Sequence, residues 1–212
     1  MPRPLTPLIS RRAAAEAALS VIDELGLDNL NLSHVARRLN VKPPSLYHHF
    51  RDKNALLEEV ARVLLIKVQA SHLDHQPLEE GIIALCVSVR RRILEHPNAA
   101  PLMLQFFPRH LLLAAYNRSA STYPYPLEIH MAVIEGTEKL TFGSALFAAA
   151  AIARGTPVMP TVDAEALPQL SRALTSNPFD DEALFVETLR IFLEGVRLRV
   201  RKGDIGRPLE TE

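Results

Sequence analysis

Side chains that could bond to nucleic acid are concentrated within a short stretch of the sequence. Hydroxyl and imidazole groups can bond to phosphate oxygens and base edges, so a helix with Ser45, Tyr47, His48 and His49 on its outside could contact a duplex. The surrounding residues 31–53 hold five Lys/Arg and one Asp, a local charge of 5 − 1 = +4. Such a charge attracts phosphates. Singly, the tyrosine could be a half-buried aromatic residue and the histidines solvated surface residues, so their joint spacing carries the hypothesis.

Two short helices separated by a tight turn would position these side chains. Asn31 can cap a first helix of barely two turns, and Pro44 suits the first turn of a second. Leu46 and Phe50, four residues apart, would anchor the second helix from behind. Over about residues 31–50 this is the pattern of a helix-turn-helix, whose second helix lies in the DNA major groove.

The segment Leu32–Lys53 resembles the DNA-binding domain of the tetracycline-repressor (TetR) family. It has the Val-Ala pair of the first short helix, the Ser-Leu-Tyr-x-His-Phe run of the second, and a lysine after one capping residue. The resemblance implies a DNA-binding domain at 6–66. It implies base contacts at the entry to the recognition helix, and phosphate contacts by a tyrosine, a histidine and the lysine at the next helix N-terminus. The expected DNA contacts are Ser33, Pro43, Pro44, Ser45, Tyr47, His48, His49 and Lys53.

Apolar residues recur at three- and four-residue spacing along nearly the whole chain, which predicts an all-α protein. An N-terminal three-helix helix-turn-helix domain would be followed by a C-terminal helical domain at 67–212. The predicted helices are 6–25, 32–39, 44–50, 53–70, 78–95, 98–106, 109–117, 127–135, 138–154 and 181–202, with loops at 123–126 and 156–168. The expected buried stripes are Ile9, Ala13, Ala17, Val21 and Leu25 in the first helix, and Leu56, Leu57, Val60, Leu64 and Val68 in the fourth.

The C-terminal domain is expected to form a homodimer. Half-sites on B-DNA lie about 34–36 Å apart, so a short recognition helix works best when two copies are held at that separation, on a palindromic double-stranded operator. The apolar helices at 138–154 and 181–202 are the candidate interface. In the resembled family the corresponding pair forms a four-helix bundle across the twofold axis.

The C-terminal domain is also expected to bind a small-molecule effector. A few convergent polar groups in a mostly apolar wall are typical of ligand sites, and the resembled family encloses an apolar cavity here. Each candidate has an alternative interpretation, as surface for the polar side chains and as core for the aromatic ones. The candidates are Phe106, His110, His130 and Phe142, with Glu135 and Glu138 as further polar groups in the same region.

No metal, cofactor or catalytic site is predicted. His72, Asp74 and His75 offer metal-ligand chemistry, but no second cluster completes a coordination sphere, so a polar helix end is favoured and a metal is left open. The chain has no glycine-rich phosphate loop, nucleophile elbow or Cys-His pair. The run Arg90–Arg92 is assigned to a solvated helix face.

The composition fits a globular protein of a reducing compartment. Of the 212 residues, 48% are apolar and 23% charged. The net charge is zero, but residues 1–70 carry ten Lys/Arg against seven Asp/Glu (+3), and residues 71–212 carry fourteen against seventeen (−3). The lone Cys86 excludes an intramolecular disulfide, and no apolar run approaches the about 20 residues of a membrane span, which predicts a cytoplasmic protein without membrane contact.

These predictions converge on a ligand-responsive transcriptional regulator, expected to be a repressor that a small molecule releases from its operator. Two alternatives remain open. One is a helical small-molecule-binding protein without DNA binding, and the other is an α-helical enzyme with an unrecognised site. Affinity for DNA that falls steeply with salt would separate the regulator from both.

Overall fold

The computed structural model describes residues 9–66 and 78–206. Within these ranges the regular structure is helical, without a strand, which confirms the all-α prediction. The α-helices are α1 (Arg11–Leu25), α2 (Leu32–Arg38), α3 (Pro44–Tyr47), α4 (Lys53–Ile66), α5 (Leu78–Leu94), α6 (Leu102–Gln105), α7 (Leu113–Thr122), α8 (Leu127–Arg154), α9 (Pro168–Ser176) and α10 (Asp181–Lys202). Two short 3-10 helices are η1 (Pro97–Ala99) and η2 (Arg109–Leu111).

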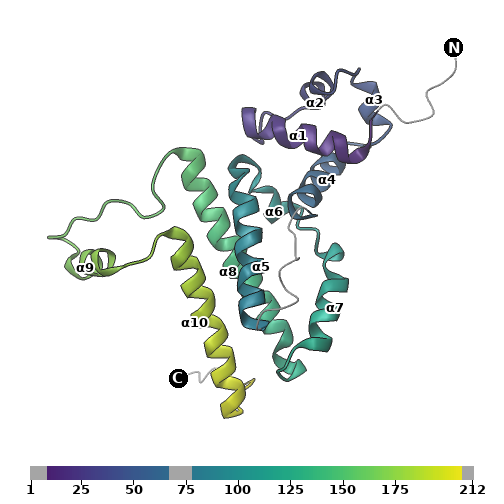
Figure 1. Cartoon of the computed structure of the whole chain (residues 1–212). Helices are drawn as coiled ribbons and strands as arrows, with labels where there is room; N and C mark the ends of the chain where they lie inside the picture. The colour runs from purple at the N-terminus through teal and green to yellow at the C-terminus, as the bar shows by residue number, and fades with distance from the viewer. Residues whose placement is uncertain (1–8, 67–77, 207–212) are drawn as a thin grey trace.

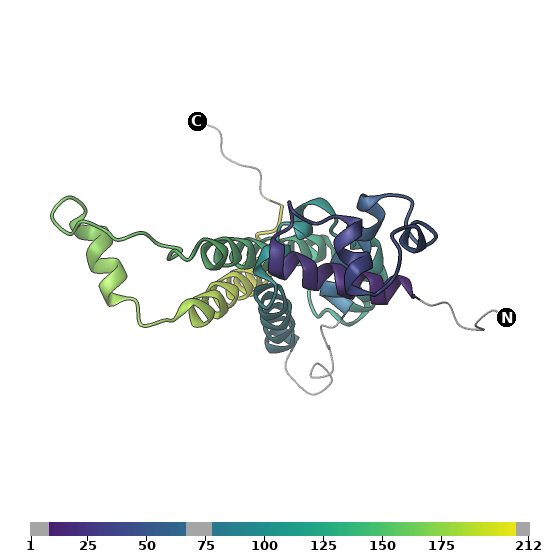
Figure 2. The same ribbon diagram turned by 90° about the horizontal axis from the view of Figure 1, so that it is seen from above.

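The helices form two groups that meet at one end of the long bundle. Helices α1 to α3 lie together at the top of Figure 1, and α4 leads down from them toward α5, α8 and α10, which run side by side. Helix α9 sits on an arm that projects away from the bundle, as the view from above shows (Figure 2). Among the described residues, no helix combines the length and hydropathy needed to cross a bilayer.

Two clusters of buried apolar side chains hold the molecule together. The first contains Leu56 and Val60 of α4 together with Ile93, Leu102 and Ala145 from beyond the predicted domain boundary. The helix-turn-helix end and the long helices therefore share one core. A movement of the long helices would be transmitted through this core to the helix-turn-helix.

The second cluster lies between α5, α8 and α10. Its members include Cys86, Val133, Phe185 and Leu189. Cys86 is 8% exposed, which confirms its interpretation as a small core residue. Burial raises the pKa of its thiol.

The apolar stripe predicted for α1 is wrong at its C-terminal end. Leu25 is 45% exposed, whereas Ala14, Ala18 and Ile22 are fully buried. A step of four residues advances by about 40° beyond a full turn, so the four steps from Ile9 to Leu25 carry the stripe off the core. In α4, the prediction is confirmed at Leu56, Leu57, Val60 and Leu64, and Val68 lies outside the described residues.

Helix α8 is one continuous helix where two were predicted, at 127–135 and 138–154. Gly136 lies inside it, and a Cβ at this position would come within 2.2 Å of Phe192 Cζ on α10. The glycine therefore permits a close approach of two helices and does not end one.

Three other segments differ from the prediction. The helices predicted at 98–106 and 109–117 are broken into η1 with α6 and η2 with α7. Helix α9 was not predicted, and it begins at Pro168, which had been assigned to the end of a loop. Proline is well suited to the first position of a helix, because the N–H it lacks has no helical partner there.

The Arg90–Arg92 run is not simply a solvated face. Arg90 is only 2% exposed. Its guanidinium donates to Ser144 Oγ at 2.8 Å, pairs with Asp181 and lies 5.3 Å from the centre of the Phe185 ring. Arg90 thus joins α5 to α8 and to the start of α10, which corrects the sequence-based interpretation.

Candidate nucleic-acid interface

Helix α2 is fixed by its cap and by two small inward side chains. The side-chain oxygen of Asn31 accepts a hydrogen bond from the backbone N–H of His34 at 2.9 Å, as predicted for an N-cap. Val35 and Ala36 are 0% and 1% exposed. Ser33 lies on the opposite, exposed face of this helix.

The turn between α2 and α3 depends on Asn40. Its φ of 54° is in the left-handed region, where asparagine is tolerated better than most other residues. The backbone N–H of Val41 then donates to the carbonyl of Ala36 at 3.0 Å. This closes the turn tightly and sets the crossing of the two short helices.

Helix α3 presents its polar residues outward because two apolar side chains anchor it. Leu46 is 0% and Phe50 1% exposed, whereas Tyr47 is 56% exposed. The α-helix proper ends at Tyr47, three residues before the predicted end. The N–H of Phe50 still donates to the carbonyl of Leu46 at 2.9 Å, so the chain continues as a helical turn and the second anchor is retained.

The proposed DNA contacts all reach the surface. Each is exposed or half-buried, and none is part of the core. The exposed ones are Ser33, Pro43, Pro44, Tyr47 and His48, and the half-buried ones are Ser45, His49 and Lys53.

Lys53 stands at the N-terminus of α4, where free backbone N–H groups and the helix dipole favour an anion. Asp52 caps this helix, since its Oδ1 accepts from the backbone N–H of Ala55 at 2.8 Å. The combination of a lysine with a helix N-terminus is suited to a phosphate group.

Arg11 supports the candidate interface from within the protein, and the sequence analysis did not identify it. It donates to the backbone carbonyl of His49, and its guanidinium lies 4.5 Å from the centre of the Phe50 ring. It thereby ties the start of α1 to the end of the α3 turn. Its partners lie almost 40 residues away along the chain, so no local sequence pattern could indicate this contact.

Part of the local positive charge is neutralised within the protein. Arg38 pairs with Glu24 on α1, and Arg51 pairs with Asp52 at 3.2 Å. Among the described residues, the basic side chains of this segment without a carboxylate partner are Arg37, Lys42 and Lys53.

The predicted ligand contacts occupy different environments. Phe106 and Phe142 are partly buried against the first core cluster. His110 is exposed on η2. His130 is buried at 6% exposure, with its ring centre 5.1 Å from that of Tyr123. The aromatic pair and the buried histidine are therefore candidates for separate parts of a ligand site.

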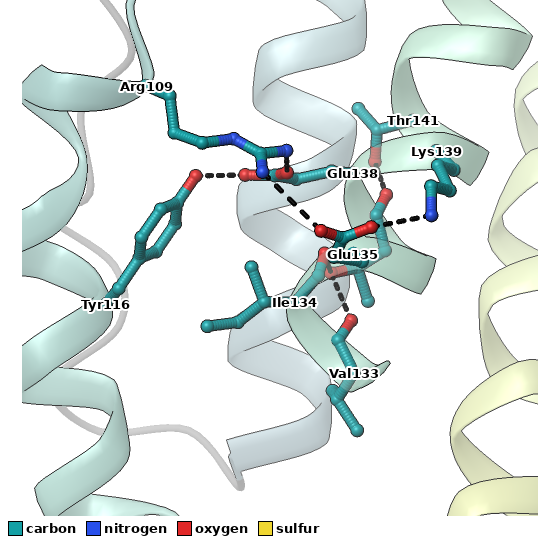
Figure 3. Close-up of polar contacts among 9 residues, drawn as sticks. Arg109, Tyr116, Val133, Ile134, Glu135, Glu138, Lys139 and Thr141 are labelled. Atoms are coloured by element: carbon teal, nitrogen blue, oxygen red, sulfur yellow. Dashed lines mark hydrogen bonds and ion pairs between the residues drawn. The ribbon is translucent and has the colours of Figure 1, made fainter. Parts of the chain in front are cut away.

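A polar cluster joins η2 and α7 to α8 (Figure 3). Tyr116 donates to Glu138, and Arg109 donates to the same carboxylate at 2.7 Å. Glu135 is shared between Arg109, at 3.5 Å, and Lys139, at 2.6 Å. Burial, and then Glu138, raise the pKa of Tyr116, which keeps the phenol neutral. Because α7 has no buried residue, this cluster is a principal link that holds α7 on α8.

The His72, Asp74 and His75 group lies outside the described residues. Within residues 9–66 and 78–206, no group of three His, Cys, Asp or Glu side chains could hold a metal ion.

Comparison with known proteins finds a family match over the N-terminal part of the chain. Residues 15–60, which span most of α1 through most of α4, match the family described as "Bacterial regulatory proteins, tetR family". The chain is 24% identical over 202 residues to the tetracycline repressor protein class D of Escherichia coli, covering 91% of each.

Two solved structures have a similar fold. A possible TetR family transcriptional regulator from Streptomyces coelicolor A3(2) is similar with a TM-score of 0.72 and 23% identity, over 89% of this chain and 99% of that one. ActR of Streptomyces coelicolor, in complex with (S)-DNPA, is similar with a TM-score of 0.68 and 22% identity, over 92% of this chain and 99% of that one. With the helix-turn-helix geometry described above, these similarities show that residues 15–60 match the tetR family of bacterial regulatory proteins and that the chain has the fold of the solved TetR-family structures.

Proposed function

We propose that the outward face of α3 enters the major groove of a palindromic operator, and that a small molecule bound among the C-terminal helices releases it. The observation that carries this proposal is the alternation of exposure on α3. Tyr47 is 56% exposed although it lies between Leu46 and Phe50, both essentially fully buried. A tyrosine that a fixed backbone holds outward can place its hydroxyl against a phosphate of a duplex.

The individual contacts are those that the resemblance to the tetracycline-repressor family implies for these positions. Pro43, Pro44 and Ser45 enter the groove first and touch base edges and a thymine methyl group. Tyr47 and His49 donate to phosphates on one side, and Lys53 meets a phosphate at the start of α4. Ser33 on α2 can bond only a nearby phosphate, because its side chain is too short for a bidentate base contact.

The operator is bound by a homodimer in this proposal. Leu184, Ile191 and Leu198 follow one another at seven-residue spacing on α10 and are 46%, 64% and 44% exposed. Phe147 of α8 is 71% exposed and lines a shallow groove together with Leu184. Seven-residue spacing of apolar side chains is typical of helices that pair along their length, so a second copy of α8 and α10 would cover this stripe.

The effector signal reaches α3 through the shared core and one polar joint. His96 Nδ1 and Asp23 Oδ2 lie 2.8 Å apart, and the Asn98 amide donates to the carbonyl of Asp23 at 3.0 Å. These contacts couple the end of α5 and η1 to α1. A ligand that binds one arrangement of the long helices more tightly shifts the equilibrium between two separations of the recognition helices. The shift in free energy is at most the difference between the ligand's affinities for the two arrangements.

No catalysis is part of this function, and we place the protein in the cytoplasm with its DNA. The structure of ActR, which has a similar fold, holds a small molecule, (S)-DNPA.

Salt-dependent DNA binding tests the proposal. The affinity for a labelled pool of random duplexes should fall steeply with salt, and Lys53→Ala should lower the slope of log K against log salt by about one unit, since one phosphate contact is lost. Arg172→Ala is the control that also removes one positive charge, because Arg172 is exposed on α9, far from the helix-turn-helix, and should leave the slope unchanged. Equal slopes for wild type and Lys53→Ala would contradict the phosphate role, and no binding by wild type would favour a helical protein without DNA binding.

A further inference from the structure

Three polar atoms are buried together near the start of α8 without a hydrogen-bond partner among the described residues. They are the hydroxyl of Tyr123 and both ring nitrogens of His130. The two side chains are only 8% and 6% exposed. Their rings are in edge contact, with centres 5.1 Å apart and planes at 61°. Two adjacent side chains, each more than nine-tenths buried, thus both lack hydrogen-bond partners within the described residues.

The surroundings of Tyr123 are mostly apolar and aromatic, with the Glu79 carboxylate also near enough to raise the pKa of its phenol. Tyr123 belongs to the second core cluster with Ile129 and Val133. Tyr125 packs edge-on against Tyr123 at 5.0 Å, and its hydroxyl donates to Glu79 at 2.7 Å. The hydroxyl of Tyr125 therefore has a hydrogen-bond partner, whereas the Tyr123 hydroxyl and the His130 ring nitrogens have none among the described residues.

Neither inner ring can be explained as core packing alone. A buried donor or acceptor without a partner costs its full desolvation penalty, whereas phenylalanine would fill a similar volume without this cost. Burial raises the pKa of Tyr123, so its phenol is neutral and can both donate and accept. Groups that reduce stability and are nevertheless present are typical of functional sites.

We propose that Tyr123 and His130 form the polar part of the effector site, and that the effector is a small, mainly apolar molecule with an uncharged oxygen group. The inference rests on the ligand response proposed above and specifies its chemistry. A neutral imidazole offers one donor and one acceptor, and the phenol offers both, which matches a hydroxyl or carbonyl oxygen. An apolar wall around these groups favours an uncharged molecule over an ionic one.

A matched pair of tyrosine variants tests whether the Tyr123 hydroxyl is unpaired. Tyr123→Phe removes only that oxygen, so the melting temperature of the protein should stay the same or rise. Tyr125→Phe makes the same chemical change in the adjacent ring but breaks the hydrogen bond to Glu79, so it should lower the melting temperature. A fall for Tyr123→Phe equal to that for Tyr125→Phe would show that its hydroxyl is already satisfied within the protein, and would overturn the proposal.

Four single-ring probes test the ligand chemistry in the full-length protein. Benzyl alcohol and acetophenone carry an uncharged oxygen, toluene carries none and benzoate is charged. The His130 ring signal, assigned in ¹³C-histidine NMR by its loss in His130→Phe, should shift saturably with the first two probes and less with the others. In Tyr123→Phe, the dissociation constants of the first two should rise by about threefold to tenfold, as expected for one hydrogen bond. Equal binding of toluene and benzyl alcohol, or unchanged binding in Tyr123→Phe, would refute it.

DNA binding separates this inference from the function on which it rests. Without a probe, Tyr123→Phe should bind the duplex pool as wild type does, since the hydroxyl lies in the C-terminal part. If wild type bound the oxygen-bearing probes but no duplex, the proposed regulator function would fail and the binding subsite would stand. If wild type bound duplexes but the probes gave no difference, the subsite would fail and the regulator would stand.

Discussion

The orientation of α3 can be tested with two adjacent substitutions that should have opposite consequences. Leu46→Ala removes a side chain with 0% exposure from the first core cluster and leaves a cavity. Such truncations cost about 2–5 kcal/mol of unfolding free energy. For a chain of this size that corresponds to a fall in melting temperature of roughly 4–20 °C, at about 2–4 °C per kcal/mol.

Tyr47→Ala is the counterpart. Tyr47 is 56% exposed, so its truncation should change the unfolding free energy by no more than about 0.5 kcal/mol. It should nevertheless weaken duplex binding, by about tenfold for the loss of a phosphate hydrogen bond. Urea unfolding followed by circular dichroism, together with fluorescence anisotropy on a labelled duplex, measures both quantities. If Tyr47→Ala destabilised the protein as much as Leu46→Ala, the outward face of α3 would be assigned incorrectly.

Three further substitutions or treatments test the packing of the long helices. Gly136→Ala should cost about 1–3 kcal/mol in urea unfolding because its Cβ would clash with Phe192, whereas Gly143→Ala, where a Cβ would meet nothing within 4 Å, should be neutral or stabilising; equal effects would contradict the close approach. Ile191→Lys should convert the dimer to monomer in light scattering, and an unchanged mass would place the interface elsewhere. Because burial raises the pKa of Cys86, its thiol should react with a disulfide reagent at pH 8 far more slowly in the native protein than in urea, and equal rates would contradict its burial.

The helix-turn-helix could be predicted because its determinants are local. Asn31, Leu46, Phe50 and Asp52 act on residues three or four positions away, so their spacing alone indicates both caps and the anchored face. The predicted DNA contacts reach the surface for the same reason. Once Leu46 and Phe50 face inward, helical geometry leaves the intervening side chains outside.

The errors arose where a distant segment decides the outcome. Two helices were predicted at 127–135 and 138–154 because nothing local indicates that Phe192 lies against Gly136 between them. Arg90 was assigned to solvent because its partner Asp181 lies 91 residues later. Arg11 was overlooked for a similar reason, since its contacts with the end of the α3 turn form only in the folded protein. Helix α9 is different, because Pro168 is a local start signal that had been interpreted as part of a loop.

Selection of bound duplexes from a random library tests the central claim most directly. If α3 reads the major groove from a dimer, the recovered sequences should share an inverted repeat whose half-site centres lie about 34–36 Å apart, or a multiple of that. The same selection with Pro44→Ala or Ser45→Ala should relax the preference within each half-site and leave the spacing unchanged. Recovery of no common sequence by the wild-type protein, or of a single unrepeated site, would contradict the dimeric helix-turn-helix account.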